Sequence, residues 1–252
     1  MTPLEICHST RSIDSKSSLM KTQFVFLGIA ALAVSCSNLE PKGHDEDTIS
    51  NQAPENRVAS TSIGDSEAGK TSYMICGTCH GQKAEGMRSL NAPALANQEP
   101  YYLKQQINNF KNNLRGVHQD DLYGSQMLPM AKLLQSDKAV DDVIAYITSM
   151  ESVMTEQTLD GGDVANGKSY YQMICGACHG PGAKGNESLH SPNLIGMEDW
   201  YVKRQIENFK TGVRGAEQGD LYGSQMLQIA NAVPDQQAIL DLTAYFHSLQ
   251  SE

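Results

Sequence analysis

The stretch MICGTCHG, residues Met74–Gly81, returns almost unchanged as MICGACHG, residues Met173–Gly180. Each copy contains Cys-x-x-Cys-His, so two thiols and an imidazole lie close together along the chain. Residues of these types at this spacing bind a metal, form a redox disulfide or attach a haem covalently. The rest of the sequence has to decide which of these chemistries the chain carries twice.

The two motifs belong to a longer internal repeat. GDSEAGKTSYMICGTCHG aligns with GDVANGKSYYQMICGACHG, with one extra residue in the second copy, and DLYGSQML recurs letter for letter. From Cys76 and Cys175 onward the offset stays at 99 residues. A fixed offset over a whole unit indicates tandem duplication. We therefore expect two domains, 64–150 and 163–252, joined by a linker, 151–162.

Hydrophobic periodicity predicts that both repeats are helical. One helix is expected to run into each Cys-x-x-Cys-His segment, a second to begin at Tyr101 or Trp200, and a last one to close each repeat. The sequence contains no convincing strand alternation, so the expected fold class is all-α. The apolar stripes comprise Leu103, Ile107 and Phe110; Val202, Ile206 and Phe209; Val140, Val143, Ile144 and Ile147; and Ile239, Leu242 and Phe246.

Domains of about 90 residues bury little apolar surface and often need a staple. A zinc site would pair Cys76/Cys79 with Cys175/Cys178, but paired zinc motifs usually lie about 15–20 residues apart. A thioredoxin-like redox motif belongs to a βαβ unit, which a helical repeat does not provide. A covalent haem c in each domain fits both the motif and the size. The predicted attachment residues are Cys76, Cys79, Cys175 and Cys178, with His80 and His179 as proximal iron ligands.

With these motifs, the chain resembles the dihaem class I cytochromes c of the cytochrome c4 and c553 type from about Gly64 to Glu252. The resemblance rests on the two Cys-x-x-Cys-His segments, a methionine before each last helix and an Ala-Tyr pair within that helix. It implies two haem c domains arranged back to back, each a small helical bundle, with electron transfer as the function. It also implies that the carbonyl groups of Pro93 and Pro192 accept a hydrogen bond from the proximal histidines.

A methionine is the candidate for the sixth iron ligand, because none of the remaining histidines is repeated. Met127 and Met226 lie well beyond the motif histidines, in a loop expected before each last helix, where the chain can return to the opposite haem face. Met130 competes in the first repeat, but Ile229 replaces it in the second. We therefore predict Met127 and Met226 as ligands. A thioether ligand raises the reduction potential relative to two histidines.

Further repeated residues have expected roles. The resemblance implies that Gly69 and Gly167 allow the last helix to cross closely, with Tyr146 or Tyr245 packed near the tyrosine of the first helix. Two polar pairs either reach the haem propionates or make ordinary surface and helix-end contacts. These pairs are Arg115/Arg214 and Tyr123/Tyr222.

The amino terminus resembles an export signal. Lys21 precedes the apolar run FVFLGIAALAV, which has signal length and is too short to cross a bilayer. The run ends in AVSC, as in lipoprotein signals, so Cys36 is the expected lipidated residue; ordinary cleavage after Ser35 is the alternative. We expect a signal region over 1–35, of which the first 19 residues lie upstream of a natural start at Met20, and a disordered tether over 36–63. The expected location is the periplasm, with a lipid anchor to a membrane.

Charge narrows the class of partner. The formal charge is −10, and removing residues 1–35, with three of the 19 Lys/Arg and two of the 29 Asp/Glu, leaves −11. Such acidity argues against nucleic acid and suits a partner with a basic docking face. We expect membrane-bound electron donor and acceptor complexes as partners, and a carrier rather than an enzyme. The alternatives are a dedicated haem subunit of a larger dehydrogenase and a dihaem peroxidase.

Overall fold

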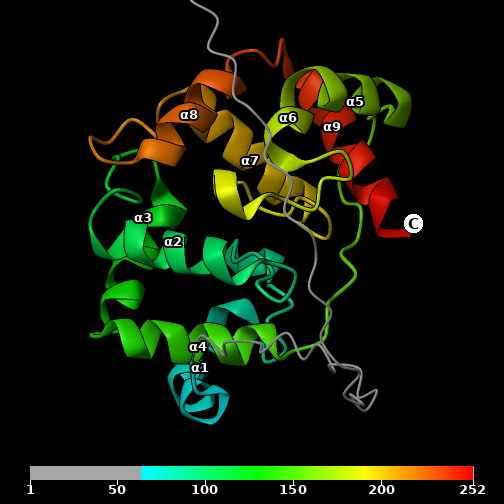
Figure 1. Cartoon of the computed structure of the whole chain (residues 1–252). Coiled ribbons are helices and arrows are strands. Elements are labelled where there is room, and N and C mark those ends of the chain that lie inside the picture. Colours follow the sequence, from blue (N-terminus) through cyan, green and yellow to red (C-terminus); the bar gives the residue numbers. More distant parts are fainter. Residues whose placement is uncertain (1–63, 252) are drawn as a thin grey trace, which may run out of the picture. The chain divides into compact units, whose positions relative to one another are not determined.

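The computed structural model describes residues 64–251 (Figure 1). The predicted signal region, Cys36 and the predicted tether lie outside these described residues. Within the described residues the regular elements are helices, besides two isolated β-bridges, which confirms the all-α fold class. None of these helices is long and apolar enough to cross a membrane.

Both predicted domains contain the same order of helices. The first has α1 (Ser66–His80), the 3-10 turn η1 (Arg88–Leu90), α2 (Pro100–Lys111), α3 (Leu122–Lys132) and α4 (Asp137–Thr148). The second has α5 (Val164–Tyr170), the π-helical turn η2 (Tyr171–Cys175), α6 (Gly176–His179), η3 (Glu187–Leu189), α7 (Asp199–Lys210), α8 (Leu221–Ala230), α9 (Gln236–Ser248) and the final turn η4 (Leu249–Ser251).

The first and last helices of each domain cross in contact, α1 with α4 and α5 with α9 (Figure 1). A Cβ atom on Gly69 would lie 1.9 Å from the backbone oxygen of Asp142 in α4, so a larger residue does not fit without displacing a helix. The rings of Tyr73 and Tyr146 pack with their centroids 5.4 Å apart. The second domain repeats this arrangement with Gly167 against Asp241 and Tyr171 against Tyr245.

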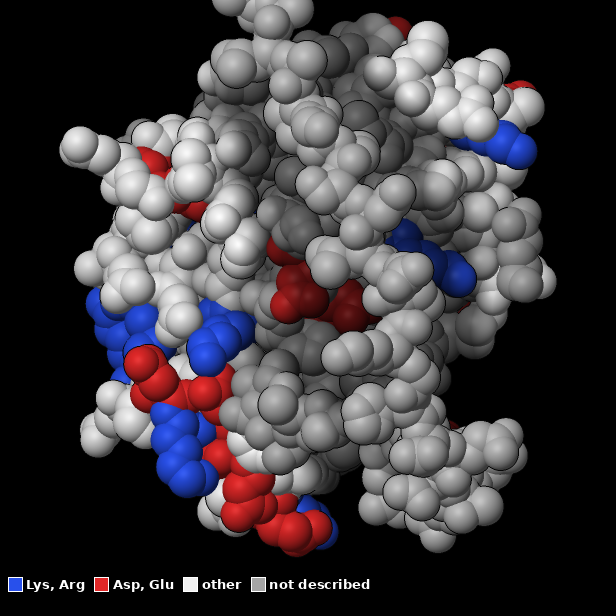
Figure 2. All heavy atoms as spheres, viewed as in Figure 1, with Lys and Arg blue, Asp and Glu red and all other residues white. Residues whose placement is uncertain are grey.

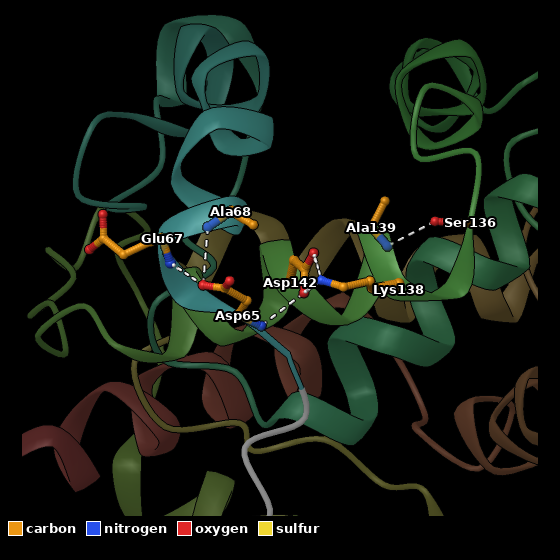
Figure 3. Close-up of polar contacts among 7 residues, drawn as sticks. All are labelled: Asp65, Glu67, Ala68, Ser136, Lys138, Ala139 and Asp142. Carbon is orange, nitrogen blue, oxygen red and sulfur yellow. Dashed lines mark hydrogen bonds and ion pairs between the residues drawn. The ribbon is translucent and has the colours of Figure 1, made fainter.

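One carboxylate ties the start of α1 to α4 (Figure 3). Asp65 caps α1 by accepting hydrogen bonds from the N–H groups of Glu67 and Ala68, and its own N–H donates to Asp142 Oδ1 over 2.8 Å. Lys138 Nζ donates to both oxygens of Asp142. The ammonium group, together with the Asp65 N–H, holds the pKa of Asp142 below its usual range.

The second domain makes the same tie without the ammonium group. The N–H of Asp163 donates to Asp241 Oδ1 over 2.8 Å, and the side-chain amide of Gln237 donates to the same oxygen over 2.8 Å. Gln237 is the residue that aligns with Lys138. The link between the first and last helices therefore survives a change from an ion pair to a neutral hydrogen bond.

The extra residue of the second repeat is absorbed by η2. The offset between aligned residues rises from 98 to 99 between the buried tyrosine of the first helix and the first motif cysteine. The helix is uninterrupted in α1, whereas the second copy forms a π-helical turn there, which accommodates one more residue. Tyr73 and Tyr171 still donate to the matching carbonyl groups of Gly81 and Gly180. Both ends of the helix thus keep their contacts.

The predicted apolar stripes contribute to one core cluster in each domain. Core side chains such as Ile144 in the first domain and Leu242 in the second have no exposed surface. The first cluster comprises Tyr73, Ala84, Leu103, Leu134, Val140, Val143, Ile144 and Ile147. The second comprises Tyr171, Ala183, Val202, Ile206, Val233, Ala238, Ile239, Leu242, Tyr245 and Phe246.

Met127 and Met226 lie in helices α3 and α8, so the expectation that they lie in a loop was wrong. The side chain of Asp121 caps α3 by accepting a hydrogen bond from the N–H of Gly124 over 2.9 Å. Asp220 caps α8 in the same way. A capping carboxylate at the helix start offsets the low helix propensity of the glycine and serine that follow it.

Acidic and basic side chains are intermixed over the part of the molecular face where α4 runs (Figure 2). Lys104 forms an ion pair with Asp141 at 2.6 Å, and Lys138 forms one with Asp142 at 2.6 Å. The acidic excess of the chain is therefore partly balanced by neighbouring cations on the first domain.

Candidate functional site

Each domain contains a cavity that brings the predicted cysteines, histidine and methionine together. In the first domain, Cys76, Cys79 and His80 reach the cavity from the end of α1, and Met127 reaches it from α3. The second cavity is lined by Cys175, Cys178, His179 and Met226. The two motifs thus serve separate cavities. Because Cys76 and Cys79 line one cavity and Cys175 and Cys178 line the other, the two pairs do not form one shared zinc site.

The motif histidines are held in the tautomer that suits a metal ligand. His80 Nδ1 lies 2.7 Å from the carbonyl oxygen of Pro93, and His179 Nδ1 lies 2.9 Å from that of Pro192. Because a carbonyl oxygen only accepts, Nδ1 carries the proton and the Nε2 lone pair stays free. Burial lowers the pKa of both histidines, which favours the neutral imidazole that binds iron.

The cysteine thiols differ in exposure within each motif. Cys76 and Cys175 are half-buried, whereas Cys79 and Cys178 are exposed, and none of the four forms a disulfide. Burial raises the pKa of Cys76, and it raises the pKa of Cys175 to about 12. A raised pKa is the opposite of the lowered pKa that marks the reactive cysteine of a redox motif.

The methionines on the far helices occupy equivalent places. Met127 and Met226 are both half-buried and line the two cavities. Met130 also lines the first cavity but is 40% exposed, and Ile229 holds the matching place in the second. Met197 lines both cavities, although the sequence gave no reason to single it out, because Gln98 takes its position in the first repeat.

Buried arginines connect the two domains through reciprocal hydrogen bonds. Arg115 donates to Gln106 in its own domain over 2.9 Å, and to Tyr201 and Gln205 in the other domain over 3.0 and 3.1 Å. Arg214 mirrors it. Its partners are Gln205 in its own domain, and Tyr102 and Gln106 in the other.

Residues of both domains therefore line each cavity. Tyr102 and Gln106 line the cavity of the second domain, and Tyr201 and Gln205 line that of the first. The repeated arginines therefore lie at the domain interface and along both cavities. Sequence reasoning did not find the glutamine partners; their identity in both repeats was the available signal.

Buried nitrogen atoms without partners support the fit of a haem in both cavities. Arg115 Nε in the first cavity and His190 Nδ1 in the second are buried without a hydrogen-bond partner among residues 64–251. A haem carries two carboxylates, and a buried donor without an acceptor is costly. Apolar walls, a free imidazole nitrogen, a thioether and the unpaired guanidinium donor of Arg115 match what a haem requires.

Comparison with known proteins also indicates two haem-binding domains in this chain. The family model described as Cytochrome c matches residues 66–151 and again 164–250. Cytochrome c4 of Azotobacter vinelandii is 30% identical over 164 residues, covering 60% of this chain and 75% of that protein. A thiosulfate dehydrogenase electron acceptor of Stutzerimonas stutzeri is 29% identical over 171 residues, covering 64% and 73%. The crystal structure of reduced recombinant cytochrome c4 from Pseudomonas stutzeri superimposes with a TM-score of 0.54 at 25% identity, covering 73% of this chain and 98% of that one.

Proposed function

The chain belongs to the cytochrome c family, with two such domains in tandem and a covalent haem c in each, and from this premise we propose that it passes electrons from a membrane donor complex to a terminal oxidase or reductase. It is a cytochrome c4-like electron carrier. When bound, haem iron supplies a one-electron Fe(III)/Fe(II) couple. The protein's contribution is to hold that couple, shield it and set its potential.

The observation that carries this proposal is the placement of a histidine and a methionine on each cavity. His80 and Met127 line one cavity, and His179 and Met226 line the other. With a histidine and a methionine both bound to it, the iron would have no open position for a substrate. A site of this kind exchanges electrons rather than binding a reactant, so we assign the chain as a carrier and not an enzyme.

The second ligand set argues against a division of labour between the haems. A dihaem peroxidase needs one iron with an open or displaceable ligand, whereas Met127 and Met226 occupy equivalent helices with equivalent burial. A role as the haem subunit of a larger dehydrogenase is the stronger alternative. It is favoured by the similarity to the thiosulfate dehydrogenase electron acceptor. Copurification of the native protein with a dehydrogenase would support that alternative.

Substituting histidine for the methionines tests the carrier function. We expect Met226→His to lower the potential of the second haem and to leave the first nearly unchanged, because imidazole favours Fe(III) more than a thioether does. A fall of about 59 mV corresponds to a tenfold change in equilibrium constant for a one-electron couple. Met127→His is the matched variant, and it should act on the other haem alone.

The readouts are a redox titration and the ferric methionine–iron charge-transfer band. Each substitution should remove half of that band together with the shift in potential. If Met226→His leaves both potentials and the band intact, Met226 is not a ligand. An open iron position would then make the peroxidase alternative the better interpretation.

Export and a lipid anchor belong to the same proposal. Support comes from the apolar run before AVSC, and Cys36 is the residue that would carry the acyl chains. Two acyl chains are needed for stable anchoring. Mass spectrometry of the mature protein should find acylated Cys36, and Cys36→Ala should release protein that keeps both haems. An unmodified amino terminus on soluble native protein would refute the anchor and leave the carrier function intact.

A further inference from the structure

Positions 105 and 204 are equivalent in the two repeats but hold different residues. Gln105 lies on α2 and Arg204 lies on α7, at the 99-residue offset. Each side chain reaches across the interface, so that Arg204 lines the first cavity and Gln105 lines the second. A permanent positive charge therefore faces one haem site, while a neutral amide faces the other.

The guanidinium group of Arg204 is held firmly at the first cavity. It donates to the side-chain and backbone oxygens of Asn91, each over 3.0 Å. Its central carbon lies 4.5 Å from the ring centroid of Tyr123 and 5.0 Å from that of Trp200. Among residues 64–251, none of the ion pairs within 4.0 Å involves this group, so its charge is not cancelled by a direct partner.

The second cavity fills the matching space with an aromatic pair. His190 replaces Asn91, and its ring stacks on that of Tyr222 with centroids 4.1 Å apart. Tyr101 meets the same imidazole edge-on at 6.3 Å. Gln105 leaves its amide oxygen buried and without a hydrogen-bond partner. No arginine takes the place of Arg204 on this side.

The other arginines and acids that line the cavities are matched between the two sites, Arg115 by Arg214 and Asp121 by Asp220. Glu198, which is buried and interacts with Arg204 without lining the cavity, aligns with the half-buried Glu99. The net charge of each domain also makes the surroundings of the first haem more positive than those of the second. Residues 64–150 hold eight Lys/Arg against nine Asp/Glu, whereas residues 163–252 hold six against ten. Arg204 is thus the principal charge difference at the cavities.

We propose that Arg204 makes the first haem the higher-potential site, so that an electron entering the chain settles in the first domain. This inference rests on the proposed function as a dihaem carrier. A fixed positive charge near the iron favours Fe(II), which carries one positive charge fewer than Fe(III). Arg204 acts through the electrostatic potential at the first cavity, and the second domain thereby tunes the haem of the first.

Reciprocal exchange of the two residues is the decisive experiment. Spectroelectrochemical titration of the dihaem protein should give two one-electron waves. Arg204→Gln should lower the higher of the two potentials by about 59 mV, which is a tenfold change in the equilibrium constant for reduction, and leave the lower potential unchanged. Gln105→Arg should raise the lower wave instead. Arg204→Lys keeps the charge and should keep most of the upper potential, although it loses the forked hydrogen bonds.

The inference is overturned if Arg204→Gln moves neither wave, moves the lower one, or moves both equally. It is also overturned if Arg204→Lys lowers the upper wave as much as glutamine does, since packing would then be the cause. The methionine–iron band separates this failure from failure of the proposed function. If both haems show the band and Arg204→Gln leaves both potentials unchanged, only the role of Arg204 is rejected. If the wild-type protein lacks the bands, the assignment of the methionine ligands is rejected first.

Discussion

The two domains keep the same predicted ligands at equivalent positions but differ in how neighbouring residues support them. The first has an uninterrupted α1, an ion pair on the helix tie and an arginine from its neighbour at the cavity. The second has a π-helical turn, a neutral hydrogen bond and a stacked histidine in the corresponding places. The comparison separates what the haem site requires from what can vary. Helix crossing, proline carbonyl and methionine are retained, while charge is free to diverge.

The largest expected effect tests the helix crossing that both domains share. Gly69→Ala places a Cβ atom 1.9 Å from a backbone oxygen of α4, and Gly167→Ala does the same against α9. We expect each substitution to lower the free energy of unfolding by about 3 kcal/mol, near the upper end for overpacking. Denaturant unfolding followed by haem absorbance measures both. A markedly smaller loss in Gly167→Ala would show that η2 lets the second helix yield.

The next effect concerns a contact between Asp199 and the linker for which the equivalent position of the first domain has no acceptor side chain. Asp199 accepts hydrogen bonds from the N–H groups of Thr158 and Leu159 and from the Thr158 hydroxyl, over 2.5 to 2.6 Å. Pro100 stands at the equivalent place in the first domain. Asp199→Ala should lower the free energy of unfolding by about 2 kcal/mol, because several donors lose a charged acceptor. Pro100→Ala is the control and should cost less; equal losses would contradict the assigned role.

A smaller effect is expected from a buried acid that crosses from the second domain to the first. Glu198 accepts a hydrogen bond from the N–H of Ala94 over 2.9 Å, and burial raises its pKa. A raised folded pKa contributes stability at low pH that is lost as pH rises through the folded pKa. Glu198→Gln should therefore be more stable than wild type at neutral pH, by up to about 1 kcal/mol, with less pH dependence.

Thermal unfolding at several pH values checks this prediction, with Glu99→Gln as the matched variant in the first repeat. Glu198→Gln should gain most on the neutral side of the acid range and nothing at the lowest pH. A loss of stability at neutral pH would instead indicate that the ionised carboxylate is favourable where it lies, for example through its attraction to Arg204.

The smallest effect should follow deletion of Gln172, which makes the second helix match the first in length. The contacts at both ends of the helix already coincide in the two domains, so the deletion removes only the π-helical turn. We expect full haem loading and a change in stability within about 1 kcal/mol. Mass spectrometry and unfolding curves measure both quantities. Loss of the second haem would show that the extra residue positions Cys175.

Local sequence signals predicted most of the fold. Apolar periodicity identified the helices that bear Leu103 and Ile144, and the repeated glycines identified the crossing. The helices with Met127 and Met226 were missed because DLYGSQML is short and contains glycine, although its aspartate is a capping signal. The position of the π-helical turn depends on tertiary contacts at both ends of the helix, which a pairwise alignment of repeats does not contain.

The sequence predicted candidate ligands for each site but not the residues that surround them. Cysteines, histidines and methionines are marked by motif and repetition, whereas Gln106, Gln205 and Arg204 gain their roles only when two distant helices meet. Nothing in the spacing of residues along the chain shows that one repeat supplies the wall of the other repeat's cavity. Contacts between units are long-range information, and local pattern does not encode them.

The reciprocal arginine contacts have a consequence for how the two halves can change. Arg115 contacts a tyrosine and a glutamine of the second half, and Arg214 contacts the equivalent tyrosine and glutamine of the first half. This reciprocal pattern is that of the isologous interface in a symmetric homodimer. In a homodimer every substitution appears twice, so both sites always remain identical. Joining the subunits through residues 151–162 removes that constraint. One repeat can then hold an arginine where the other holds a glutamine. Two redox centres that began with the same potential can thereby acquire different potentials.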